Sequence, residues 1–129
     1  MAIGTIAGTG VIQVVLAELV LRIHDLLGNK VKKIVVYGSY ARGDAHKDSD
    51  MDIMVMVNAD SEQLRQYRSC VLDIQVDLSL EYEIVISIML QSMDEYNKWL
   101  PVLPFFQNVE REGVDICGNN EARFIPISL

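Results

Sequence analysis

The segment Met51–Val57 constrains the fold of this chain more than any other segment. It reads MDIMVMV, and its middle residues are apolar at both odd and even positions. Successive side chains of a β-strand point to opposite faces of a sheet, so this strand is apolar on both faces. Such strands lie in the middle of a sheet that is covered on both sides. The segment therefore predicts a central strand with helices packed around it.

Other segments have strand or helix patterns that complete this picture. Val31–Tyr37 (VKKIVVY) and Ile84–Leu90 (IVISIML) are rich in β-branched residues and predict two more strands. Helical spacing or capping residues predict helices over 11–27, 61–81, 92–99 and 105–112, with a short last strand over 114–117. This order predicts an α/β (α+β) fold, in which helices pack on a small mixed β-sheet. We expect one domain over residues 1–129, because no linker or repeat divides the chain.

The charge balance restricts what the protein binds. The 129 residues carry a formal net charge of -7. This charge disfavours non-specific binding to nucleic acid, which needs a basic surface to displace counterions. It does not disfavour a nucleotide bound with its metal, because that ligand needs only a local site.

The N-terminal region and the cysteines indicate a cytoplasmic protein. Residues 1–10 contain no lysine or arginine, and Glu18 and Arg22 interrupt the apolar run that follows. We therefore expect neither a secretory signal nor a membrane span. Cys70 and Cys117 lack metal-ligand spacing, and we expect two buried free thiols.

The first predicted helix, residues 11–27, is apolar around much of its circumference. One face carries regularly spaced apolar residues, and further apolar residues lie outside that face: Ile12, Val14, Leu16, Val20 and Leu21. A helix of this kind is buried on more than one side. We expect that a second copy of the chain covers part of it in a homo-oligomer.

A polar loop between the first two strands contains groups suited to phosphate. Gly38 lacks a Cβ atom and lets the backbone approach a ligand closely. Ser39 offers a hydroxyl and a backbone N–H at the start of a helical turn, where anions bind. Arg42 adds a planar, permanently charged donor.

Two carboxylates follow this loop at the head of the central strand. Asp50 and Asp52 flank Met51, and alternate residues of a strand face the same way. Their Cα atoms are expected to lie roughly 6–7 Å apart. Carboxylate oxygens in this arrangement bind hard divalent cations, and such cations stabilise phosphoryl transfer.

Together these residues resemble a known family. Gly38-Ser39, ten intervening residues and Asp50-Met51-Asp52 match the G-S-x10-D-x-D signature of the DNA polymerase beta-like nucleotidyltransferases. The longer run GSYARGDAHKDSDMDIMV is similar to the minimal nucleotidyltransferases, and the late run PFFQNVEREGVDI resembles them more loosely. The resemblance implies the polymerase beta-like nucleotidyltransferase fold.

The resemblance also implies a reaction, a cofactor and a partner. Family members transfer a nucleoside monophosphate from a nucleoside triphosphate, such as ATP, to a hydroxyl group with Mg²⁺. Gly38 and Ser39 would contact the triphosphate, and Asp50 and Asp52 would hold metal. Many minimal nucleotidyltransferases are antitoxins that act beside a HEPN-domain protein, and some adenylylate it.

Arg42 and Ser49 complete the predicted nucleotide-binding set, with structural alternatives for both. Arg42 is as well suited to an ion pair with Asp44 or Asp48 as to a phosphate contact. Ser49 is placed to shape the turn that precedes Asp50.

One departure from the family leaves catalysis open. Active members usually carry a third carboxylate on a later strand, but Ile84–Leu90 contains no acid, and its polar residue is Ser87. If the run IQVDLSL formed a strand instead of a helix, Asp77 would be the third catalytic acid. Two functions therefore remain: an active nucleotidyltransferase, or a catalytically impaired module that neutralises a partner by contact.

Overall fold

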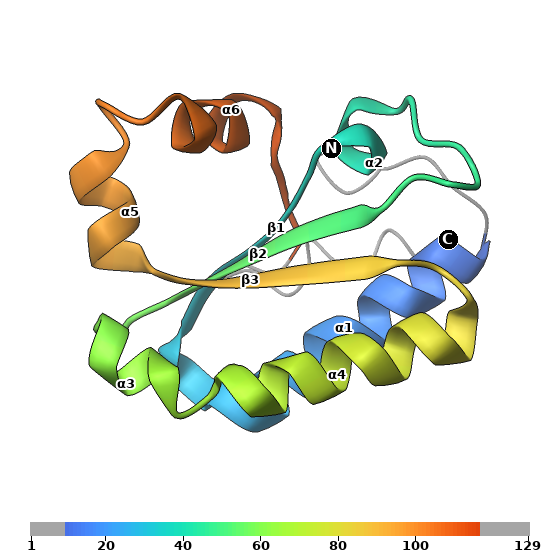
Figure 1. The fold of residues 1–129 in the computed structure, drawn as a ribbon, viewed down its shortest axis with the longest axis horizontal. Coiled ribbons are helices and arrows are strands. Elements are labelled where there is room, and N and C mark those ends of the chain that lie inside the picture. The colour runs from blue at the N-terminus through green and yellow to red at the C-terminus, as the bar shows by residue number, and fades with distance from the viewer. Residues whose placement is uncertain (1–9, 117–129) are drawn as a thin grey trace.

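The computed structural model describes residues 10–116, which form a mixed α/β arrangement (Figure 1). A four-stranded sheet lies between helices, as the sequence predicts. The elements follow in the order α1 (Gly10–Leu27), the 3-10 helix η2 (Gly28–Lys30), β1 (Val31–Tyr37), α2 (Ser39–Arg42), β2 (Met51–Val57), α3 (Ser61–Arg65), α4 (Arg68–Tyr82), β3 (Ile86–Ser92), α5 (Met93–Trp99), α6 (Pro104–Glu112) and β4 (Val114–Asp115).

The sheet is mixed, and β2 lies inside it. The strand order is β3-β2-β1-β4. β1 pairs antiparallel with β2 and with β4, whereas β2 pairs parallel with β3. In β2, Met51 and residues 53–57 are all buried. The prediction of a central strand covered on both faces is therefore confirmed.

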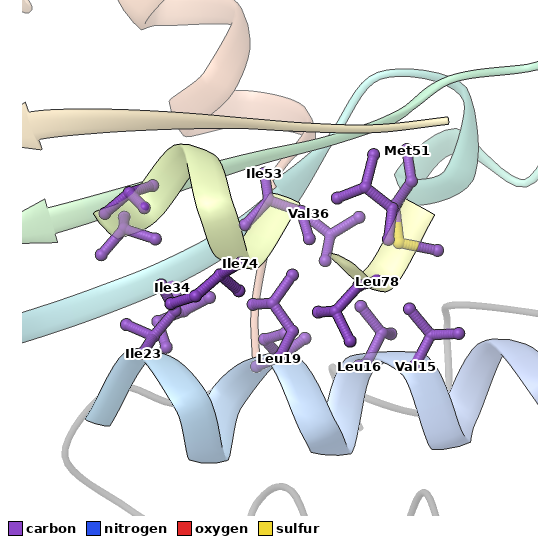
Figure 2. Packing of buried hydrophobic residues seen from close by; sticks show 14 of the residues in the cluster. Val15, Leu16, Leu19, Ile23, Ile34, Val36, Met51, Ile53, Ile74 and Leu78 are labelled. Atoms are coloured by element: carbon purple, nitrogen blue, oxygen red, sulfur yellow. The ribbon is translucent and has the colours of Figure 1, made fainter. Parts of the chain in front are cut away.

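Helices α1 and α4 cover one face of the sheet. Their apolar side chains meet those of the strands in the larger core cluster, and Figure 2 shows residues of α1 and α4 pointing toward the sheet. The labelled members of this cluster are Val15, Leu16, Leu19, Ile23, Ile34, Val36, Met51, Ile53, Ile74 and Leu78. Each such side chain stabilises the fold by about 1.5–3 kcal/mol through removal of apolar surface from water.

Helices α5 and α6 pack on the opposite face, over the alternate residues of the strands. Val35 of β1 and Met54 and Met56 of β2 contact this layer. The helices contribute Tyr96, Phe106 and Val109. Because strand side chains alternate, every even-numbered residue of β2 faces this second layer.

Several element boundaries differ from the sequence prediction, most of all in the second long helix and the third strand. The predicted helix over 61–81 is two helices, because a turn in which the Tyr67 N–H donates to the Leu64 carbonyl separates α3 from α4. The third strand begins at Ile86 rather than Ile84, because Glu83 ends α4 in the left-handed conformation at φ 56°. Ser92 accepts a hydrogen bond from the Glu95 N–H, so the predicted cap before α5 is confirmed.

Three further predictions concern the exposed side of α1, the burial of the cysteines and a membrane span. In α1, Val11, Val14 and Leu21 are exposed, and a homo-oligomer through this helix stays a prediction. Cys70 lies exposed on α4, so its predicted burial is wrong, and Cys117 lies outside the described residues. Within residues 10–116, no helix has the length and apolarity needed to cross a membrane.

Candidate active site

The loop after β1 turns at two glycines. Gly38 has φ 80° and ψ -152°, a conformation that is essentially restricted to glycine, and Gly43 ends α2 at φ 85°. The Gly38 carbonyl accepts hydrogen bonds from the N–H groups of Ala41 and Arg42. Gly38 therefore occupies the cap position of α2, and Ser39 is its first residue. The first amides of a helix have no intrahelical acceptor, which leaves them available to an anion.

Gly38 also brings the loop into contact with the second carboxylate. A Cβ atom at Gly38 would lie only 2.7 Å from Oδ2 of Asp52. Asp52 is the register partner of Tyr37, the residue just before Gly38. The carboxylate therefore packs against the backbone of the turn, so the two halves of the sequence motif meet at one point.

Asp52 faces the side of the sheet on which α5 and α6 pack, and Asp50, just before β2, lies close enough for its charge to act on Asp52. Burial, and then the negative charge of Asp50, raise the pKa of Asp52, while the positive charge of Arg42 lowers it. Desolvation and a like charge disfavour the ionised form. A bound divalent cation would offset both costs, so the chemistry of this pair fits a divalent metal ion. Within residues 10–116, no group of three or more acid, histidine or cysteine side chains forms a metal cluster.

Two tyrosines border the carboxylates. Burial and the charge of Asp52 raise the pKa of Tyr37, and burial and the charge of Asp50 raise the pKa of Tyr40. The Tyr37 ring packs edge-on against Phe105 of α6, with 5.7 Å between ring centroids. Both phenols therefore stay neutral at physiological pH, and neither cancels nor adds charge beside the acids.

Arg42 connects this loop to a distant part of the chain. Its Nε donates to Oδ2 of Asp44 at 3.3 Å, which confirms one of the predicted ion pairs. Its Nη1 donates to Oε1 of Glu112, also at 3.3 Å. Sequence reasoning missed Glu112, although it lies within the late run PFFQNVEREGVDI that resembles the family.

Ser49 has a structural role in the loop. Its Oγ accepts a hydrogen bond from the His46 N–H at 2.9 Å, and its own N–H donates to the His46 carbonyl. These two bonds stabilise the turn that immediately precedes Asp50 and β2. The alternative in which Ser49 shapes this turn is confirmed, while its contact with a nucleotide stays a prediction.

The structure excludes Asp77 from the carboxylate pair. The run that contains Asp77 is part of helix α4, and Asp77 accepts a hydrogen bond from Nη2 of Arg22 at 3.1 Å. Helix α4 covers the face of the sheet opposite Asp52. The prediction of Asp77 as a third catalytic acid is therefore wrong, because its backbone is helical and its side chain pairs with α1.

The residue on β3 beside the carboxylates is Ser87. It is the register partner of Asp52 in the parallel pairing of β2 and β3. Its neighbours Ile86 and Ile88 pack on the α1 and α4 side, so Ser87 faces the same side as Asp52. The structure thus places Gly38 against Asp52, brings the charges of Asp50 and Arg42 to bear on that carboxylate, and sets the Ser87 hydroxyl on the neighbouring strand. Ser39 and Ser49 are the chain neighbours of Gly38 and Asp50, and their contact with a nucleotide stays a prediction.

Comparison with known proteins identifies relatives of this chain. The profile of the nucleotidyltransferase domain matches residues 16–101. Two proteins of Methanocaldococcus jannaschii, each named as a proposed protein adenylyltransferase, are similar. One is 36% identical over 84 residues, covering 65% of this chain and 76% of the relative. The other is 31% identical over 94 residues, covering 73% and 87%.

Solved structures share the fold at lower identity. A chain of a toxin–antitoxin complex with AMP-PNP matches with a TM-score of 0.55 and 17% identity, over 89% of this chain and 80% of that one. A chain from a complex of the MNT antitoxin with the tri-AMPylated HEPN toxin of Shewanella oneidensis has a TM-score of 0.51 and 15% identity, over 89% and 82%. At these identities the likeness establishes the fold alone.

Proposed function

The chain belongs to the nucleotidyltransferase domain family, and we propose that it transfers a nucleoside monophosphate from ATP to a hydroxyl group of a partner protein or small molecule, with Mg²⁺ as its cofactor. This proposal rests on the close approach of the Asp52 carboxylate to the backbone of Gly38. This approach joins a turn suited to phosphate to a carboxylate suited to metal, and one nucleotide–metal ligand would engage both.

Each residue of the site has a distinct part in the proposed reaction. Asp50 and Asp52 would hold the divalent cation, which when bound offsets negative charge on the phosphates and on the leaving oxygen. The backbone at Gly38 and Ser39 would receive the triphosphate, and Arg42 would contribute a permanent positive charge. The acceptor hydroxyl oxygen would form a bond to the α-phosphorus as the bond to pyrophosphate breaks, and the hydroxyl proton would pass to water.

We further propose that the acceptor is a HEPN-domain protein and that this chain is the antitoxin of the pair. Two observations support this choice. Its M. jannaschii relatives are named as proposed adenylyltransferases of proteins. One of the structures with the same fold comes from a complex that contains an AMPylated HEPN toxin.

Radiolabelled transfer tests the proposal. The protein is incubated with [α-³²P]ATP, Mg²⁺ and a HEPN-domain protein encoded beside it, and label on the partner is measured. We expect transfer by the wild type and a loss of at least about 10²-fold in Asp50→Asn, because one carboxylate of the metal pair is gone. Asp73→Asn, the same change on the exposed surface of α4, serves as the control. No labelling by the wild type, or full labelling by Asp50→Asn, contradicts the proposal.

The position of Ser87 favours a second candidate, a module that neutralises its partner by contact without catalysis. A serine beside Asp52 leaves two carboxylates where active family members usually have three. This function predicts that Asp52→Asn neutralises the HEPN protein as well as the wild type does. A variant that binds the partner but no longer neutralises it would exclude this second candidate.

A further inference from the structure

The guanidinium of Arg42 lies between carboxylates from two separate parts of the chain. Asp44 belongs to the same loop, whereas Glu112 is the last residue of α6 and lies 70 positions further along. The Arg42 side chain is 46% exposed, and that of Glu112 is 29% exposed. Glu112 also lies 3.7 Å from Nη2 of Arg111, so its second oxygen faces another arginine.

A tightly packed element fixes the backbone of Glu112. Phe106 and Val109 of α6 are buried against the sheet, which holds the helix in place. At the end of the helix, a Cβ atom on Gly113 would clash with both the Val109 carbonyl oxygen and Cγ1 of Val35. Only glycine lets the chain pass so close to β1. The carboxylate of Glu112 is therefore presented by a rigid support rather than by a free loop.

Without Glu112, the carboxylates of the site itself become alternative acceptors for Arg42. The Arg42 backbone N–H donates to the Gly38 carbonyl at 3.0 Å, and the Asp52 carboxylate packs against Gly38, so the arginine and this carboxylate belong to the same turn. Ion pairing between Arg42 and Asp52 would place a side-chain cation where the metal is expected. It would also turn the guanidinium away from the Gly38–Ser39 turn. Asp44 lies on the same loop as Arg42, so the ion pair with Asp44 cannot by itself anchor Arg42 to the rest of the fold.

We propose that Glu112 is a positioning residue, which holds Arg42 beside the Gly38–Ser39 turn for the phosphates of the nucleotide and keeps it off Asp50 and Asp52. The inference rests on the proposed function, because Arg42 matters in this way only when a nucleotide binds. The competing view is that the pair between Arg42 and Glu112 is an ordinary surface ion pair, with little effect on nucleotide affinity or on the free energy of unfolding.

A double-mutant cycle on nucleotide affinity separates these two views. The dissociation constant of α,β-methylene-ATP with Mg²⁺ is measured by calorimetry for the wild type, Glu112→Gln, Arg42→Ala and the double variant. We expect Glu112→Gln to weaken binding by about fivefold, within the range of coupled pairs. In the Arg42→Ala background the same change should have no further effect, because Glu112 acts through Arg42.

Stability controls accompany the cycle. Glu62→Gln makes the same change in an exposed ion pair with Arg65 on α3, and should leave nucleotide affinity unchanged. If Glu112→Gln lowers the thermal midpoint more than Glu62→Gln does, the cycle is repeated with Glu112→Asp. That variant keeps the negative charge but withdraws the carboxylate from Arg42. We expect it to weaken nucleotide binding in the wild-type background and to have no further effect in the Arg42→Ala background.

The outcomes distinguish this inference from the proposed function. If the wild type binds the analogue but the two single effects multiply in the double variant, Glu112 does not act through Arg42 and the inference is overturned. Unchanged affinity in Glu112→Gln overturns it as well. If the wild type does not bind the analogue at all, the proposed function is overturned, and the inference with it.

Discussion

Asp52 of β2 and Ser87 of β3 are register partners in adjacent parallel strands, and both face the layer of α5 and α6. A hydroxyl therefore lies beside the carboxylate pair at the place where the family resemblance leads one to expect a third acid. A serine is neutral at physiological pH and adds no charge for a second cation. Metal binding at this site therefore depends on the two carboxylates of Asp50 and Asp52.

Replacing Ser87 with aspartate should strengthen the activity of the site. In Ser87→Asp the new carboxylate points to the same side as Asp52, where it can bind metal or accept the proton of the acceptor hydroxyl. We expect transfer from labelled ATP to rise by roughly tenfold or more, at the low end of general-base effects. Ser87→Asn, which is similar in size but neutral, is the control. Equal rates in the two variants would show that a carboxylate at this position does not matter.

Replacing Gly38 with alanine should damage both stability and nucleotide binding. Alanine at this φ and ψ costs about 1–3 kcal/mol in free energy of unfolding. Its Cβ would also displace the Asp52 carboxylate. Urea unfolding and Mg²⁺-dependent binding of the ATP analogue measure the two effects.

Gly28→Ala provides the matched control for that change. Gly28 also has a positive φ, of 60°, but a Cβ there meets no atom within 4 Å. This variant should lose stability through its backbone while keeping its affinity for nucleotide. If Gly38→Ala behaves in the same way, the close approach of Asp52 to Gly38 has no role in binding.

Replacing Asp52 with asparagine should stabilise the metal-free protein at neutral pH. The folded-state pKa of Asp52 is raised, so the folded protein binds this proton more tightly than the unfolded chain does. The contribution of Asp52 to the free energy of unfolding therefore falls as pH rises from 3.8 through the raised pKa. Thermal melts should show a higher midpoint for Asp52→Asn than for the wild type at pH 7, with the difference shrinking at lower pH. A variant less stable than the wild type at pH 7 would contradict this account.

Replacing Tyr96 with phenylalanine should destabilise the second core layer. The Tyr96 side chain is buried, and its hydroxyl donates a hydrogen bond of 2.7 Å to Oε1 of Glu110. Loss of a hydrogen bond to a charged group costs about 1.5–3 kcal/mol. Urea unfolding of Tyr96→Phe and of the control Tyr67→Phe, which lacks such a bond, measures the difference. Equal stabilities would mean that water replaces the bond at no cost.

The sequence by itself determined the first two strands and the local part of the site. The bounds of β1 and β2 follow from their β-branched and apolar runs, which form strands wherever they are buried. The turn at Gly38 and the direction of the Asp52 side chain on β2 depend on short-range geometry: a glycine conformation and the two-residue period of a strand. Such features are encoded by neighbouring residues, so their spacing in the chain was enough to predict them.

Only the tertiary structure decided which distant residues join that local site. Glu112 reaches Arg42 because α6 packs against β1 through Gly113, and no local pattern records that contact. Ser87 stands beside Asp52 because the parallel pairing of β2 and β3 sets their register. Asp77 is turned to the opposite face because the apolar side of α4 packs with α1. These placements depend on how whole elements pack, and packing is a property of the assembled core rather than of any one segment.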